Sequence, residues 1–141
     1  MSTLERAIAI AAEAHAGQVD WSGVPYVLHP IRMMLRVSSN DERIVAVLHD
    51  VCEDCPGWTF DRLRQEGFSD RVIEALRSVT KRDGEDYEAF VRRAAANPIG
   101  RSVKLADLQD NADLSRIAAP SERQLALIEK YRRAIDLVGR L

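Results

Sequence analysis

The sequence contains no long apolar run, which excludes a membrane-spanning helix of roughly 20 such residues. It also lacks an excess of basic residues. Its 20 basic and 22 acidic side chains give a net charge of −2, without the basic surface that duplex nucleic acid requires. Residues 1–6 do not follow the pattern of a signal peptide. We therefore expect a cytoplasmic protein with neither a membrane nor a nucleic-acid partner.

Cysteine is scarce as well, since Cys52 and Cys55 are the only two. A structural zinc ribbon needs a second cysteine pair, which the sequence does not have. A redox pair needs an accessible thiol of low pKa, and the carboxylates of Glu53 and Asp54 between the two cysteines would raise the thiol pKa. The Cys-x-x-Cys spacing therefore gives little support to a redox or zinc role.

The sequence shows no strand-like alternation, internal repeat, glycine-rich phosphate loop or linker. Its 141 residues suit one domain with a sizeable core, and 46% hydrophobic with 30% charged residues is an ordinary globular composition. Helix signals follow one another along the chain instead. They predict a helix after a Ser2-x-x-Glu5 capping box, a short helix over 31–37, a central helix from the 39–42 capping box to Pro56, helices capped by Thr59 and Ser69, a helix from Tyr87 to Asn97, a segment over 103–112 and a terminal helix after Pro120.

The most informative stretch is 46–54, which carries one imidazole and three acids: His49, Asp50, Glu53 and Asp54. An apolar stripe at helical spacing runs beside them, formed by Ile44, Val47, Leu48, Val51 and Cys55. On such a helix His49 and Glu53 are i, i+4 neighbours, as are Asp50 and Asp54. Crowded ionisable groups are costly unless something neutralises them, and a bound divalent cation is the usual means. The alternative is the solvated face of an amphipathic helix.

A loop over residues 17–30, indicated by its glycines and prolines, supplies further candidates. His29 precedes Pro30, which predicts His29 at a helix N-cap with Pro30 at the first helical position. Trp21 and Tyr26 are loop aromatics, which either wall a ligand site or plug the edge of a core.

A second polar stripe lies on the segment over 103–112, where Lys104, Asp107 and Asn111 follow the spacing i, i+3, i+7 beside an apolar stripe. Polar groups at the edge of a buried stripe indicate the wall of a site. The alternative is a helix edge in solvent, which suits Lys104 better than Asn111, because asparagine is a poor helix former.

Five motifs occur in order along the chain: AHAGQ (14–18), PYxxHP (25–30), LHDxxED (48–54), VTK (79–81) and VKLADxxxN (103–111). Together they resemble the HD-domain (p)ppGpp pyrophosphohydrolases of the RelA/SpoT type, most closely the small stand-alone alarmone hydrolases. The resemblance extends from about residue 4 to residue 138. The length leaves no room for the synthetase domain of the large bifunctional members.

The resemblance implies an all-α fold, a single HD-domain bundle of about eight helices over residues 1–141. It implies one divalent metal, typically Mn²⁺, with His29, His49, Asp50 and Asp107 as ligands. It assigns the attacking water and its proton to Glu53 and Asp54. It implies a nucleotide substrate such as ppGpp, from which the 3′-pyrophosphate is removed, and places Trp21, Ser22, Lys104 and Asn111 against that nucleotide.

The chain departs from the family pattern before Ser22-Gly23, where the family usually carries a basic pair. Asp20 and Trp21 occupy those positions. Trp21 can still stack on a base, whereas Asp20 would repel a polyphosphate. Three alternatives therefore stay open: a phosphohydrolase for another nucleotide or phosphoester, a non-catalytic nucleotide sensor, and a purely structural helical module.

Overall fold

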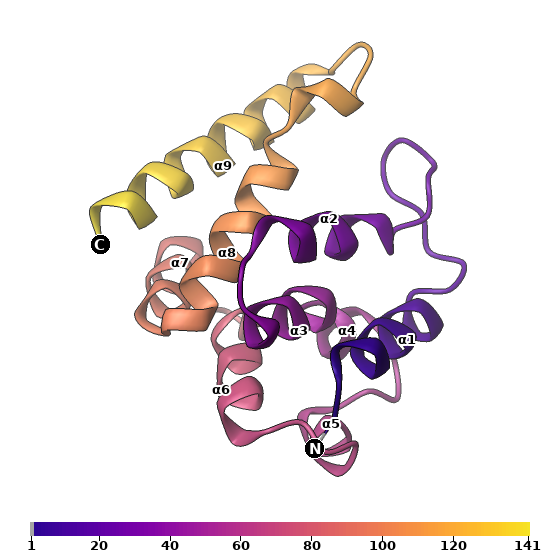
Figure 1. Ribbon diagram of the computed structural model, residues 1–141. Coiled ribbons are helices and arrows are strands. Elements are labelled where there is room, and N and C mark those ends of the chain that lie inside the picture. Colours follow the sequence, from indigo (N-terminus) through magenta and orange to yellow (C-terminus); the bar gives the residue numbers. More distant parts are fainter. Residues whose placement is uncertain (1) are drawn as a thin grey trace.

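The structure is a computed structural model that describes residues 2–141, in which the regular elements are helical (Figure 1). They are α1 (Leu4–Ala14), α2 (Leu28–Arg36), α3 (Asn40–Leu48), α4 (Val51–Asp54), α5 (Phe60–Gln65), α6 (Asp70–Ser78), α7 (Tyr87–Ala96), α8 (Pro98–Asn111), the 3₁₀-helix η1 (Leu114–Arg116) and α9 (Glu122–Arg140). Within these residues the only β-type pairing is an isolated bridge between Val19 and Pro25. The predicted all-α fold is confirmed.

Helix α3 is the centre of the packing, in contact with α1, α2, α6 and α8 (Figure 1). Its five residues from Ile44 to Leu48 are all buried, because a helix surrounded by neighbours must be apolar on every side. The Ser39–Glu42 capping box fixes its start, as predicted. Helix α3 thus carries its C-terminal end, and the histidine that follows, into the interior.

The predicted continuous central helix is wrong, since it is interrupted at His49 and Asp50. The carbonyl oxygen of Ala46 accepts both the backbone N–H of His49, at 3.4 Å, and the His49 ring at Nδ1, at 2.8 Å. This contact replaces the regular bond from the Asp50 N–H, so α3 ends and α4 begins after Asp50. The predicted apolar stripe is nevertheless buried on both sides of the break, through Val51 and Cys55.

Two predicted helix starts are also wrong. Helix α1 is capped by Thr3, not Ser2, because the Thr3 hydroxyl accepts the backbone N–H of Arg6 at 3.1 Å. Helix α2 begins at Leu28, so His29 lies in its first turn and is not the N-cap. Pro30 is tolerated there, because the first N–H groups of a helix have no acceptor within the helix.

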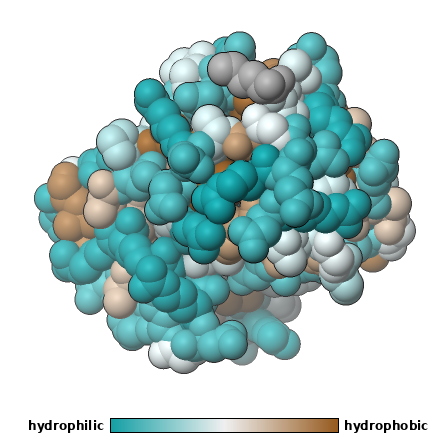
Figure 2. All heavy atoms as spheres, turned by 90° about the horizontal axis from the view of Figure 1, so that it is seen from below, coloured by the Kyte–Doolittle hydropathy of each residue, from teal (hydrophilic) through white to brown (hydrophobic). Residues whose placement is uncertain are grey.

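Helix α9 packs along α7 and α8, and Arg101 of α8 caps its end by donating to the carbonyl oxygen of Val138 at 2.6 Å. A second, smaller apolar cluster lies beneath it, made of Val91, Leu108, Ala134, Leu137 and Val138. On the face shown in Figure 2, hydrophobic residues appear as separate small areas among hydrophilic ones. Among residues 2–141, no helix combines the length and the apolar character that crossing a membrane would need.

Candidate metal centre

The four side chains predicted as metal ligands converge from three segments. His29 lies in the first turn of α2, His49 and Asp50 form the α3–α4 junction, and Asp107 lies on α8. The Nε2 atom of His29 is 3.0 Å from Asp107 Oδ1, and Nε2 of His49 is 2.9 Å from Asp50 Oδ2. Asp107 Oδ1 is also 3.8 Å from His49 Nε2, so it bridges the two imidazoles.

The donor set fits a divalent ion. Both histidine rings are anchored through Nδ1, His49 on the Ala46 carbonyl at 2.8 Å and His29 on the Asp110 carboxylate at 2.6 Å. Their Nε2 atoms are therefore left to face one common point. Ligand atoms of His29, His49 and Asp50 all lie within 4.8 Å of one another. Two imidazoles with carboxylates are a mixed set that suits borderline and hard divalent ions.

Asp110 belongs to the site but was not among the residues predicted from the sequence. Its side chain is fully buried and accepts hydrogen bonds from His29 and from Arg32, whose Nε is 2.8 Å from Oδ1. Burial acts to raise the pKa of Asp110, but His29 and Arg32 outweigh it and keep the pKa below its usual range. The one sequence signal was its position three residues after Asp107, on the same side of α8.

The carboxylate of Asp107 is held from both sides by its own helix. Lys104 donates from Nζ to Oδ2 at 3.1 Å, and Asn111 donates from Nδ2 to Oδ1 at 3.0 Å. Burial acts to raise the pKa of Asp107, yet Lys104 and the two histidines keep it far below its usual range. Lys104 is only 6% exposed, so the alternative of a helix edge in solvent is wrong for this residue.

The two histidines compensate the buried acids. Burial acts to lower the pKa of His29, but Asp107 and Asp110 raise it to about 9. The pKa of His49 is raised in the same way, since Asp50 outweighs the effect of burial. Without an ion, protons on the imidazoles offset the carboxylates, and a divalent ion would take the place of those protons.

Tyr26 is the aromatic side chain of the loop that reaches this centre. Its hydroxyl donates to Asp50 Oδ2, and its ring is 5.7 Å from the ring of His29 between centroids. Burial, followed by the charge of Asp50, raises the pKa of Tyr26, so the hydroxyl stays protonated. Tyr26 therefore fixes the position of a predicted ligand.

A cavity of about 220 Å³ opens above the four converging side chains. Glu53 of α4 lines it together with Lys104, Asn111 and Tyr131. Asp54 lies next to Glu53 but does not line the cavity. Burial, followed by the neighbouring Asp50, raises the pKa of Glu53, which moves this carboxyl toward the range of a general base at neutral pH.

Trp21 and Ser22 line a second cavity of about 270 Å³, which shares Tyr26, His29, Asn111 and Tyr131 with the first. The Trp21 side chain is 63% exposed, as expected for a ligand wall and not for a core plug. The structure thus places the four predicted substrate contacts, Trp21, Ser22, Lys104 and Asn111, in two adjoining cavities.

Asp20 has a role in its own loop. Its Oδ1 accepts the backbone N–H of Ser22 at 2.7 Å, and its Oδ2 is 3.8 Å from Nη1 of Arg116. Arg116 and Arg32 both line the second cavity. The cations of this cavity therefore come from α2, which follows the loop directly, and from η1, which is far from it in sequence. Neither arginine belongs to a motif, so neither was predicted.

No protein-family model matches the chain, but individual proteins do. It is 30% identical over 120 residues to the guanosine-3′,5′-bis(diphosphate) 3′-pyrophosphohydrolase of Aquifex aeolicus, covering 77% of this chain and 17% of that protein. It is 34% identical over 111 residues to the bifunctional (p)ppGpp synthase/hydrolase SpoT of Escherichia coli, covering 76% of this chain and 15% of that one. The chain thus spans less than a fifth of the length of these relatives.

A solved structure described as a metazoan ortholog of SpoT that hydrolyses ppGpp matches with a TM-score of 0.75 at 21% identity. The match covers 96% of this chain and 84% of that one, which shows that the two share a fold. Sequence and fold agree, and the chain is therefore a relative of the RelA/SpoT-type (p)ppGpp pyrophosphohydrolases, as its motifs predicted.

Proposed function

We propose that the chain is a divalent-metal-dependent hydrolase that removes the 3′-pyrophosphate from guanosine tetra- or pentaphosphate or from a close nucleotide relative. The observation that carries the proposal is the convergence of His29, His49, Asp50 and Asp107 beneath a cavity that Glu53 lines. These four residues would hold the divalent ion, which we propose is Mn²⁺. When bound, it would supply Lewis acidity toward a phosphoryl oxygen and lower the pKa of water.

The chain's own residues account for the rest of the reaction. Glu53, with its pKa raised by burial and by Asp50, accepts the proton of the attacking water, and Asp54 assists from the next position. Water attacks the phosphorus, and the bond to the ribose 3′-oxygen breaks, so pyrophosphate and a 3′-hydroxyl are the products. Lys104, the cation of the cavity, lies where it can stabilise the negative charge that develops on the phosphoryl oxygens. Tyr26 and Asn111 keep Asp50 and Asp107 in place throughout.

The second cavity would take the nucleoside. Trp21 offers an exposed aromatic face on which a base can stack, and Ser22 and Asn111 offer hydrogen bonds to the base or sugar. The names of the sequence relatives support a guanosine substrate. Asp20 beside Arg116 favours a second candidate, a phosphohydrolase for a less highly charged nucleotide.

A phosphate-release screen tests the proposal. The Mn²⁺-loaded protein is incubated with guanosine tetraphosphate and with a panel of nucleoside mono-, di- and triphosphates, and pyrophosphate and phosphate are measured separately. We expect pyrophosphate from guanosine tetraphosphate, and none after chelation. Release only from another nucleotide would favour the second candidate, and no release from any compound would favour a sensor or structural role.

A further inference from the structure

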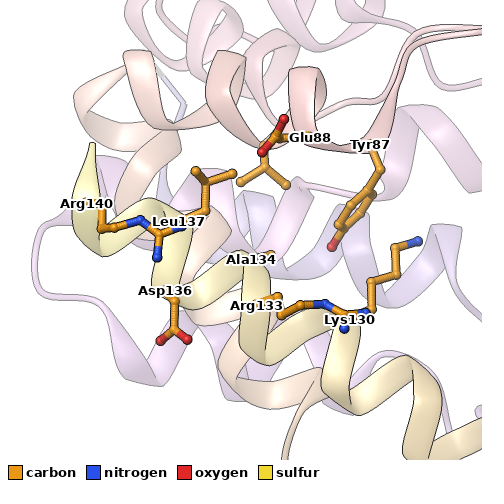
Figure 3. A pocket seen from close by; sticks show the side chains of 9 residues that line it. Tyr87, Glu88, Lys130, Arg133, Ala134, Asp136, Leu137 and Arg140 are labelled. Carbon is orange, nitrogen blue, oxygen red and sulfur yellow. The ribbon is translucent and has the colours of Figure 1, made fainter.

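A third cavity, of about 450 Å³, lies between α7 and α9 (Figure 3), and it shares Tyr87 with the cavity at the metal centre. Its apolar part is formed by Val91, Ala134 and Leu137, which belong to the second core cluster. Its remaining lining residues are polar or charged. A concave site with an apolar floor and a charged rim, of this volume, is of a size for a small organic ligand.

The rim is rich in basic side chains that have no acidic partner. Lys130, Arg133 and Arg140 line the cavity and follow one another along one side of α9 at spacings of three and seven residues (Figure 3). In residues 2–141 none of the three forms an ion pair, although other arginines and lysines of the chain do. Of the two acids on the rim, Glu88 is paired with Arg92 at 3.8 Å. Asp136, the other acid, forms no ion pair within the described residues, so the unpaired charges of the rim are three positive and one negative, and their sum is positive.

Tyr87 joins this cavity to the metal centre. The ring lines both cavities, and its centroid is 3.9 Å from Lys130 Nζ and 5.9 Å from Lys104 Nζ. The hydroxyl oxygen is buried and has no hydrogen-bond partner among the described residues. Figure 3 shows the Tyr87 side chain reaching from α7 toward Lys130 of α9. A buried hydroxyl without a partner is costly, and a ligand could satisfy it.

We propose that the α7–α9 cavity binds a small organic phosphate, distinct from the substrate at the metal centre. The bound phosphate acts on the metal centre through Tyr87. The phosphate oxygens pair with Arg133 and Arg140, because guanidinium groups bind phosphate in a fork. The apolar part of the ligand covers Val91 and Leu137. When the ligand attracts Lys130 away from the Tyr87 ring, the contacts of Tyr87 near Lys104 change. Lys104 in turn donates a hydrogen bond to Asp107.

The test uses a fluorescent methylanthraniloyl derivative of GDP as the probe and the full chain as the protein, with and without EDTA. The groove variant is Arg133→Ala with Arg140→Ala. Its matched control is Arg132→Ala, an exposed arginine next to Arg133 that does not line the cavity. We expect a binding phase that survives EDTA, weakens by about tenfold or more in the groove variant, and is unchanged in the control.

The outcomes separate this inference from the proposed function. Binding that is equally strong in wild type and groove variant overturns the inference, whether or not the protein hydrolyses nucleotides. Binding that disappears with EDTA or with Trp21→Ala, and not with the groove variant, places the probe at the metal centre and also overturns it. Once a substrate that the protein hydrolyses is known, the probe should change kcat of the wild type and leave kcat unchanged in the groove variant. Competition at the metal centre would raise KM equally in both proteins.

Discussion

At the scale of the residue, the buried carboxylate of Asp110 explains how a histidine is held ready for a metal. It accepts a hydrogen bond from His29 Nδ1 at 2.6 Å, so the ring can offer only Nε2 to the centre. The same carboxylate accepts from Arg32 Nε at 2.8 Å, and the Asp110 carbonyl accepts from Arg116 Nη2 at 2.8 Å. One residue therefore orients a predicted ligand and two cations of the adjoining cavity.

The first prediction concerns this carboxylate. Asp110→Asn should weaken Mn²⁺ binding by about 10- to 100-fold, because the orienting partner of a ligating histidine contributes that much to metal affinity. Titration calorimetry on the folded variant measures the effect, and Asp113→Asn, three residues further along, is the control. An unchanged dissociation constant in Asp110→Asn would show that the carboxylate serves only the fold.

The second prediction concerns the base. Glu53→Gln keeps the shape of the side chain and removes its proton acceptor, so turnover should fall by roughly 10²–10⁴-fold while metal content stays at the wild-type level. Pyrophosphate release and elemental analysis measure the two quantities. Asp54→Asn should have a smaller effect, because Asp54 does not line the cavity. Full turnover in Glu53→Gln would assign the proton to another group.

The sequence predicted the residues at the centre better than the contacts that hold them. His29, His49, Asp50 and Asp107 could be singled out from the sequence because their types and motifs are distinctive, and their side chains do converge; that they hold a metal stays a prediction. Asp110 and Arg32 were missed because their contacts join residues that are 78 and 81 positions apart, a separation that no local spacing reveals. Lys104 was predicted to contact the substrate, which stays a prediction, and its burial could not be predicted because it depends on the packing of α7 against α8.

At the scale of the element, the apolar patterns and caps predicted that helices form but not where each one ends. The Ser39 capping box is purely local and was predicted correctly. The break at His49 was not, because it depends on the His49 ring bonding its own helix at Ala46. The early start of α2 was not predicted either, because Pro30 fits the first turn at more than one position.

The loop between α1 and α2 carries the third prediction. Asp20→Asn keeps an acceptor for the Ser22 N–H but removes the ion pair with Arg116, which leaves Arg116 available to a phosphate. KM for guanosine tetraphosphate should fall by about two- to fivefold, the size expected for one partly exposed ion pair. Trp21→Ala is the comparison and should raise KM through the lost stacking. A higher KM in Asp20→Asn would mean that Asp20 itself binds the substrate.

The fourth prediction concerns the turn between α6 and α7, which Arg93 ties down through Glu85 at 2.8 Å and the carbonyl of Thr80 at 2.7 Å. The hydrogen bonds from Arg93 lower the pKa of Glu85 from 4.5 to about 2. A lowered folded-state pKa gives stability that is present above pH 4.5 and is lost as the pH falls toward 2. Glu85→Gln should therefore be less stable at neutral pH and lose less stability on acidification.

Urea unfolding at a series of pH values measures this dependence. Glu88→Gln is the control, since Glu88 makes only an exposed pair with Arg92 at 3.8 Å on the same helix. Parallel pH profiles for Glu85→Gln and the wild type would show that the turn is held by its backbone bonds alone.

At the scale of the whole molecule, the candidate centre lies where α2, the α3–α4 junction and α8 meet around the central helix (Figure 1). The acids there are compensated by protonated histidines when no ion is bound, and burying those charges carries a desolvation cost. An ion that replaces the protons would link three segments separated in sequence. We predicted from the sequence that residues 1–141 form one domain. This prediction can be tested, because an ion that joins the three segments should make them unfold together.

The last prediction follows from this arrangement. An ion that binds the folded state and not the unfolded chain stabilises by about 2.7 kcal/mol at 100 times its dissociation constant. For a chain of this length, that corresponds to a rise in Tm of roughly 10 °C. Calorimetry should therefore show a lower Tm after chelation, restored by Mn²⁺, with a single transition in both states if the three segments unfold together.

His49→Ala, which removes one ligand, should lose most of the response to Mn²⁺. A Tm that is unaffected by complete metal removal would contradict the centre itself, whereas a metal response with two separate transitions would contradict only the single domain.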